Sequence, residues 1–173
     1  MATSGIERVS KLSALAAADC ACGGLRRAAR AISKVYETAF APLDLTATQF
    51  SILVAVHLGG PFPLSRLAER LVLDRTTLYR AVKPLVRRRC LQILPGRTGR
   101  ERTAALTEAG RHVLSDALPI WETIQGRFVS ALGPRAWGSL TAGLRHVVPA
   151  AQALESGPAQ PGSTRARTRA GRR

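Results

Sequence analysis

The sequence predicts a mostly α-helical domain that carries one small β-hairpin. Apolar residues recur at helical spacing from about residue 20 to residue 154. Two short strand-like runs, residues 91–94 and 102–106, flank the segment "PGRTGRE", whose proline and two glycines indicate a hairpin turn. At 173 residues the chain is long enough for one domain with a hydrophobic core.

The two ends of the chain differ from this domain in composition. Residues 156–173 contain no large apolar side chain, so they cannot offset their ordering entropy, and we expect a disordered Arg-rich tail. Residues 1–18 are expected to form a flexible N-terminal lead, which leaves residues 19–155 as a single domain. The apolar run at residues 12–18 is much shorter than the roughly 20 residues of a membrane span. We therefore expect a cytoplasmic protein.

The charge of the chain indicates a polyanionic partner. Lys and Arg number 26 against 11 Asp and Glu, a net charge of +15, of which the five tail arginines leave +10 on residues 1–155. Such a balance favours nucleic acid or an anionic membrane surface. The tail lacks the apolar face that a membrane anchor needs, so we expect no membrane partner.

Three helices are expected before residue 74. The first covers residues 20–40. The second begins after the N-cap Thr46 and ends at Gly59 and Gly60. Its apolar positions are Phe50, Leu53, Val54, His57 and Leu58. The short third helix has its apolar side at Leu64, Leu67, Ala68 and Leu71.

The fourth helix, after the N-cap Asp74, has two distinct faces. Its core-facing positions are Leu78, Val82, Leu85 and Val86. Its polar and basic positions are Thr76, Arg80, Lys83 and Arg87. Pro84 lacks an N–H and is expected to kink the helix or loosen its middle turn.

A basic hairpin follows this helix. Arg97, Arg100 and Arg102 lie in or beside the predicted turn. The second, third and fourth helices followed by this hairpin form the layout of a winged helix-turn-helix, here about residues 44–106. In such a domain the recognition helix enters the major groove of DNA, and the wing reaches towards the minor groove.

These segments resemble the multiple antibiotic resistance regulator (MarR) family. The resemblance rests on "LTATQFSILVAV", "LAERLVLDRTTLYRAVKPLVRRRCL" and "GRTGRERTAALTEAG" in that order, and covers residues 20–154. It implies a triangular homodimer. The winged domains form two of its corners, and the interlocked N- and C-terminal helices form the third. It also implies a repressor that leaves double-stranded DNA on binding a phenolic or lipophilic ligand, or on thiol oxidation.

The resemblance assigns DNA-binding residues by position. Arg100 matches the wing arginine, whereas Thr98 stands where an acid often braces that arginine. The full set expected at a pseudo-palindromic operator is Arg75, Thr76, Thr77, Tyr79, Arg80, Lys83, Arg97, Arg100 and Arg102.

The helices outside the winged part are expected to form the dimer, at about residues 19–41 and 107–155. Their apolar stripes are broader than one thin chain of helices can bury, and a two-fold partner is the simplest cover. Pro119 is expected to bend the first helix after the wing, and Pro134 suits the first turn of the last one. Trp121 and Trp137 fit either packing or a ligand pocket.

The cysteines suggest a redox hypothesis. The resemblance to the organic-hydroperoxide-sensing branch places its sensor at Cys22, which lies 27 residues before Gln49, with Cys20 as a candidate resolving partner. Of that branch's tyrosines only Tyr36 is matched, since Arg26 and Ala47 stand in the other two places. The alternative is that both cysteines are small buried helix residues.

Other functions have less support in the sequence. No nucleophile–base–acid set or phosphate-binding glycine loop is present, so we expect neither an enzyme nor a cofactor. No carboxylates cluster with the histidines, and we expect His57, His112 and His146 to be structural and no metal to be bound. The alternative to a sequence-specific regulator is an architectural DNA-coating protein of low specificity, for which the Arg-rich tail is the best argument.

Overall fold

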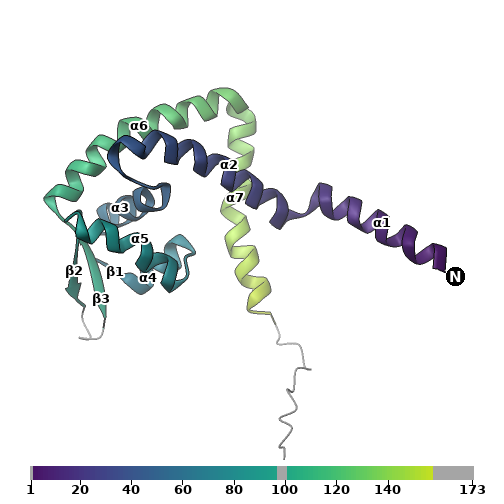
Figure 1. The fold of residues 1–173 in the computed structure, drawn as a ribbon, viewed down its shortest axis with the longest axis horizontal. Coiled ribbons are helices and arrows are strands. Elements are labelled where there is room, and N and C mark those ends of the chain that lie inside the picture. Colours follow the sequence, from purple (N-terminus) through teal and green to yellow (C-terminus); the bar gives the residue numbers. More distant parts are fainter. Residues whose placement is uncertain (1, 97–100, 158–173) are drawn as a thin grey trace, which may run out of the picture. The chain divides into compact units, whose positions relative to one another are not determined.

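The computed structural model describes residues 2–96 and 101–157 (Figure 1). It confirms a mostly helical fold with a small antiparallel sheet. The first elements are α1 (Ala2–Asp19), α2 (Ala21–Phe40), the 3-10 helix η1 (Ala41–Leu43), α3 (Ala47–Gly59), β1 (Phe62–Pro63) and α4 (Leu64–Leu71). They are followed by α5 (Arg75–Arg87), β2 (Leu91–Pro95), β3 (Arg102–Leu106), α6 (Glu108–Leu132) and α7 (Pro134–Glu155). The chain divides into two compact units after Gly126.

The N-terminal segment differs from the expectation of a flexible lead. Residues 2–19 form helix α1, although each of its described side chains is exposed. The segment "SALAAAD" contains four alanines and neither glycine nor proline, and alanine has the highest helix propensity. Local propensity therefore favours a helix in the C-terminal part of α1 without tertiary packing.

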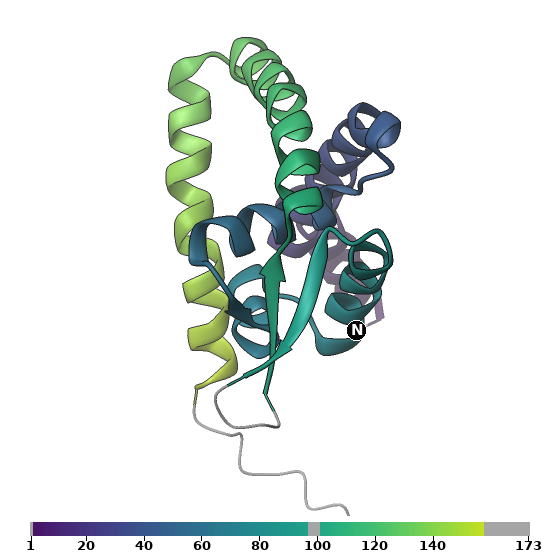
Figure 2. The same cartoon turned by 90° about the vertical axis from the view of Figure 1, so that its left-hand side faces the viewer.

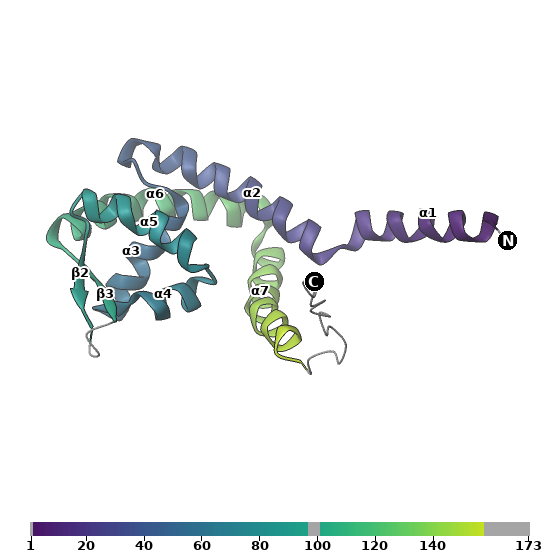
Figure 3. The ribbon, with the colours of Figure 1, turned by 60° about the horizontal axis from the view of Figure 1, so that its bottom comes forward.

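The hydrophobic core lies among α3, α4, α5 and the sheet, which are grouped together in Figure 3. Phe40 at the end of α2 and Leu114 in α6 also belong to this core. The largest fully buried side chains are Phe40, Ile52, Leu53, Val56, Leu67, Leu78, Leu85, Cys90 and Leu91. Six of these nine belong to α3, α4 and α5, so the helix-turn-helix contains most of the core.

Helix α3 begins as predicted and is more deeply buried than predicted. Thr46 and Gln49 form a capping box, in which the Gln49 N–H donates to Thr46 Oγ1 at 3.2 Å and the Thr46 N–H donates to Gln49 Oε1 at 2.9 Å. The predicted apolar stripe was wrong at His57 and Leu58, which are exposed at the C-terminal end of the helix. His57 is therefore not a histidine of the core.

The sheet has three antiparallel strands in the order β1-β3-β2. Leu91 pairs with Leu106 and Pro95 with Arg102, which gives the predicted hairpin (Figure 2). Strand β1 was not predicted, because its two residues extend the sheet only through pairing with β3. The turn residues 97–100 and the predicted tail beyond residue 157 lie outside the described residues.

The helices after the wing carry the predicted prolines without interruption. Helix α6 runs through Pro119, and α7 begins with Pro134 at its first position after Gly133, which has φ +80°. No residue of α7 is buried. Its apolar side chains therefore pack into no hydrophobic core within the described part of the chain.

None of the described helices is by itself long and apolar enough to cross a membrane, although one bent pair, Gly5–Leu43 with Ala47–Gly59, meets the criteria of length and composition jointly.

Candidate nucleic-acid interface

Helix α5 begins with a strong N-cap, as predicted. Asp74 accepts hydrogen bonds from the Thr77 N–H at 2.9 Å and from the Thr77 hydroxyl at 2.5 Å. These bonds, the side-chain one first, lower the pKa of Asp74. Thr77, expected to face DNA, thus donates its hydroxyl proton within the protein.

The two predicted faces of α5 are present. Leu78, Val82 and Leu85 are buried, and Val86 is half-buried. On the opposite side five of the predicted DNA-binding residues line one open cleft: Arg75, Thr76, Tyr79, Arg80 and Lys83. The structure therefore gathers three cations, a hydroxyl and an aromatic ring on the exposed side of the helix.

Pro84 does not end the helix, which continues to Arg87. A proline at this position removes the N–H that would bond to the carbonyl of Arg80, four residues earlier. The Arg88 N–H donates to the Pro84 carbonyl at 3.0 Å, which closes the last turn. The proline therefore costs α5 one backbone hydrogen bond, between residues 80 and 84, without ending the helix.

The described part of the wing is its base. The Gly96 N–H donates to the Glu101 carbonyl at 2.8 Å, and Arg102 is exposed at the start of β3. Arg97, Thr98 and Arg100 lie outside the described residues.

Two residues that the sequence reasoning did not single out for this role hold α5 from behind. The buried Gln49 donates through Nε2 to the Ala81 carbonyl at 3.4 Å. Arg88 donates through Nη2 to the Leu43 carbonyl at 2.8 Å and through Nη1 to the Asp44 carbonyl. No local pattern could reveal these bonds, because their partners lie 32 to 45 residues apart in the sequence.

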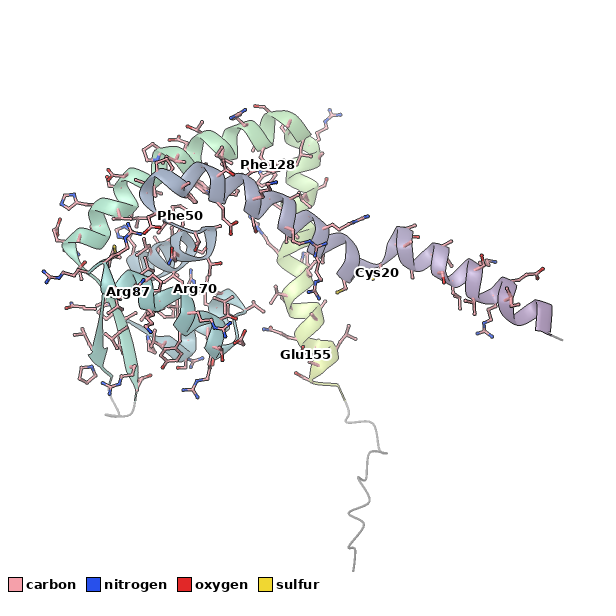
Figure 4. The ribbon with its side chains drawn as sticks, viewed as in Figure 1. Cys20, Phe50, Arg70, Arg87, Phe128 and Glu155 are labelled. Atoms are coloured by element: carbon pink, nitrogen blue, oxygen red, sulfur yellow. The ribbon has the colours of Figure 1, made fainter. Side chains whose placement is uncertain are left out.

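The cysteines lie at the junction of α1 and α2, where Figure 4 marks Cys20. Cys20 is the N-cap of α2 in an extended conformation, and its Sγ accepts a hydrogen bond from the Gly23 N–H at 3.4 Å. Cys20 and Cys22 are exposed in the single chain, whereas Cys90 is buried.

Tyr36, the tyrosine of the redox hypothesis, has a different set of contacts. Its hydroxyl donates to Gln125 Oε1 of α6 at 3.0 Å, and burial raises the pKa of its phenol. It lies fourteen residues from Cys22 on the same helix, a distance of about 21 Å at 1.5 Å per residue. The side chains of Tyr36 and Cys22 in one chain are therefore not in contact.

Comparison with known proteins agrees with this geometry. No family model matches the chain. The transcriptional regulator MosR of Mycobacterium tuberculosis, solved in complex with DNA, is 33% identical, and the match covers 79% of this chain and 98% of MosR with a TM-score of 0.71. A MarR-family regulator from Rhodococcus sp. RHA1 shares the fold at 21% identity, with a TM-score of 0.64 over 71% of this chain and 88% of the other.

A third relative is known from its sequence. The HTH-type transcriptional regulator YybA of Bacillus subtilis, itself uncharacterised, is 34% identical over 86 residues, or 49% of this chain. The match spans 57% of the length of YybA. Because the chain has a winged-helix fold and matches MosR over nearly the whole length of MosR, it belongs to the MarR family of winged helix-turn-helix transcriptional regulators.

Proposed function

We propose that the chain is a homodimeric repressor that binds a pseudo-palindromic site on double-stranded DNA. The observation that carries this proposal is the cleft on α5, which exposes Arg75, Tyr79 and Arg80 while the opposite side of the helix is buried in the core. A helix held in this way can enter the major groove with its cationic side forward. The complex of MosR with DNA supports the same role here. The relatives are transcriptional regulators, which are not enzymes, and we propose no catalytic activity for this chain.

The exposed side chains of α5 divide into two roles. Arg75 and Arg80 can bond in a bidentate manner to the O6 and N7 atoms of guanine, or grip phosphates beside the groove. Thr76 and Lys83 suit phosphate oxygens, and the Thr76 methyl also suits the thymine methyl group. On the wing, Arg97, Arg100 and Arg102 would reach the minor groove or its phosphates.

A second copy of the chain is proposed to cover α7. Leu140, Leu144, Val147 and Val148 are between 38% and 43% exposed. Contiguous apolar faces of this kind are rarely left in water, and a two-fold partner buries the same face on both copies. Such a dimer would place its two recognition helices about 34 Å apart, in successive major grooves.

DNA footprinting with the variant Arg80→Ala tests the site. The wild type should protect one short DNA sequence with two-fold symmetry. Arg80→Ala should lose this protection but keep weak non-specific binding and the oligomeric state of the wild type. Arg111→Ala, which removes an exposed arginine of α6 that pairs with Glu108, is the matched control and should protect the site normally. Unchanged protection by Arg80→Ala would contradict the assignment.

The salt dependence of binding tests the wing and the alternative function. Each lost phosphate contact should lower the slope of log K against log salt by about 0.9, and Arg100→Ala should show this change. A complex insensitive to salt would contradict DNA binding altogether. Uniform coating of DNA without a preferred site would instead favour an architectural protein, for which the charge of +15 is the supporting observation.

Oxidation of Cys22 is the release mechanism that the exposed thiols favour. The Cys22 thiolate would attack the O–O bond of an organic hydroperoxide, forming a sulfenic acid and releasing an alcohol. The Cys20 thiol would then attack the sulfenic sulfur, giving a disulfide and water. A pair inside one helix is poorly placed for such a bond, but the extended backbone of Cys20 sets it outside α2.

The cysteine variants decide between oxidation and a bound ligand. Cumene hydroperoxide should release wild-type protein from its DNA site, and Cys22→Ser should stay bound. Cys90→Ser, which changes the buried cysteine, is the matched control and should be released like the wild type. Equal release of Cys22→Ser and wild type would exclude Cys22 as the sensor, whereas failure of the peroxide to release either protein would favour a small phenolic or lipophilic inducer as the trigger.

A further inference from the structure

The C-terminal end of the recognition helix is tied to a distant turn by one arginine. Arg88 is the C-cap of α5, and its side chain is 29% exposed. Its two terminal nitrogens donate to adjacent carbonyls, Nη2 to Leu43 at 2.8 Å and Nη1 to Asp44. The Asp44 carboxylate lies 3.7 Å from Nη1 but is 94% exposed, so the carbonyls are the main partners.

The acceptors belong to the turn that joins α2 to the helix-turn-helix. Leu43 is the last residue of η1, and Asp44 has a left-handed backbone with φ +47°. Carbonyls at the end of a helix lack donors within it, and the forked guanidinium of arginine is suited to bonding two of them at once. Arg88 therefore connects the end of α5 to the turn between η1 and α3, which directly follows α2.

A second bond connects the same region to the middle of α5. Gln49, three residues after the N-cap of α3, is 6% exposed and donates to the Ala81 carbonyl at 3.4 Å. This bond is close to the turn that Pro84 weakens by removing a donor from the Arg80 carbonyl. Helix α5 is thus bonded to residues near the α2–α3 junction at two positions along its length, its middle and its C-terminal end.

We propose that Arg88 is a positioning residue, which fixes the direction of α5 relative to α2 and thereby the half-site spacing that the dimer accepts. The inference rests on the proposed function, because spacing has meaning only for a dimer that reads two half-sites. Arg75 lies 13 residues before Arg88, or about 20 Å along the helix. A tilt of about 10° at Arg88 would move Arg75 by about 3.5 Å, close to the rise of one base pair.

The test measures binding of Arg88→Lys to a series of operators. In the series the distance between half-sites is shortened or lengthened by one or two base pairs. Lysine keeps the charge but cannot bond two carbonyls with the geometry of the fork. We expect wild-type protein to prefer one spacing sharply, and Arg88→Lys to bind that spacing roughly tenfold more weakly while losing little at the others. Its salt slope should stay that of the wild type, because no phosphate contact is lost.

Two further variants make the result specific. Arg89→Lys changes the neighbouring exposed arginine in the same conservative way and should keep the sharp preference. Gln49→Glu keeps an N3 acceptor for the cap but places a carboxylate against the Ala81 carbonyl, and should broaden the preference as Arg88→Lys does. If thermal melting shows that Arg88→Lys is unfolded, Arg88→Gln, which can still donate to one of the two carbonyls, takes its place in the spacing series.

The possible failures are distinguishable. A wild-type protein without a preferred spacing overturns the proposed two-fold function, and the inference with it. A wild-type protein with a sharp preference that Arg88→Lys shares overturns the inference alone. Equal weakening at every spacing, with a lower salt slope, would make Arg88 a phosphate contact and would also overturn it.

Discussion

Helices α4 and α5 are each followed by a left-handed residue that is not glycine. Val72 follows α4 with φ +52°, and Arg89 follows α5 with φ +58°. In each case the hydrogen bonds are those of a Schellman motif, with Leu73 N–H bonded to the Ala68 carbonyl at 2.9 Å and Cys90 N–H to the Leu85 carbonyl at 2.8 Å. An L-residue with a side chain loses about 1–2 kcal/mol in this conformation, so both turns are strained.

Val72→Gly should relieve this strain. Valine is the less favourable of the two residues because it is β-branched, and its side chain is 60% exposed, so little packing is lost. We expect the free energy of unfolding to rise by about 1 kcal/mol, measured by urea denaturation. Val35→Gly, at an exposed position inside α2, should have the opposite sign, a loss of about 1 kcal/mol. A destabilised Val72→Gly would contradict the left-handed turn.

Asp74 should make the N-terminus of the recognition helix sensitive to acid. Hydrogen bonds from Thr77 lower the pKa of Asp74 below its ordinary value of 3.8. For a lowered pKa the stabilisation is complete above the ordinary value and is lost as the pH falls through the folded-state value. Asp74→Asn retains an acceptor for the Thr77 N–H but does not titrate. Thermal melts should therefore show the wild type losing stability relative to Asp74→Asn only below about pH 4; a constant difference would contradict this.

At the scale of elements, the beginning of α6 is packed tightly against Cys90, directly before β2. The Thr107 hydroxyl, which precedes α6, donates to the Cys90 carbonyl at 3.1 Å and accepts from the Gly110 N–H at 3.1 Å. A Cβ atom added at Gly110 would lie 2.0 Å from the Cys90 carbonyl oxygen. The close approach of the wing's base to α6 therefore depends on glycine at this position.

Gly110→Ala should be strongly destabilising for this reason. The backbone must move to admit the methyl group, and such overpacking typically costs about 1–3 kcal/mol. Gly126→Ala in the same helix meets nothing within 4 Å and should stabilise the protein by about 0.5–1 kcal/mol. Differential scanning calorimetry of both variants measures the contrast. Equal melting temperatures for the two variants would show that α6 does not pack as described.

The sequence predicted those elements that local chemistry determines. Asp74 and the apolar positions from Leu78 to Leu85 located α5, and proline and glycine located the hairpin. It did not predict β1, which exists only through pairing with β3, nor the bonds of Arg88 to carbonyls 44 and 45 residues away. It assigned Thr77 to DNA because the position matched, without showing that Asp74 would accept its proton.

At the scale of the whole molecule, the proposed dimer should make stability depend on concentration. Binding that occurs only in the folded state raises the apparent melting temperature as the protein concentration rises. Leu144→Glu should abolish this rise, because a carboxylate would enter the apolar face of α7, whereas Ser139→Glu on the same helix is the control. Sedimentation should show protomers for Leu144→Glu and dimers for Ser139→Glu. A melting temperature independent of concentration in the wild type, with a sedimenting protomer, would contradict the dimer.

The absence of any buried residue in α7 has a consequence for gene dosage. In the proposed homodimer the DNA-binding species forms from two protomers, so when dimers are scarce their number follows the square of the protomer concentration. Halving the copies of the protein in a cell would then leave about a quarter of the dimers. A repressor built in this way would switch its target on over a narrow range of its own abundance, before any inducer or oxidant acts.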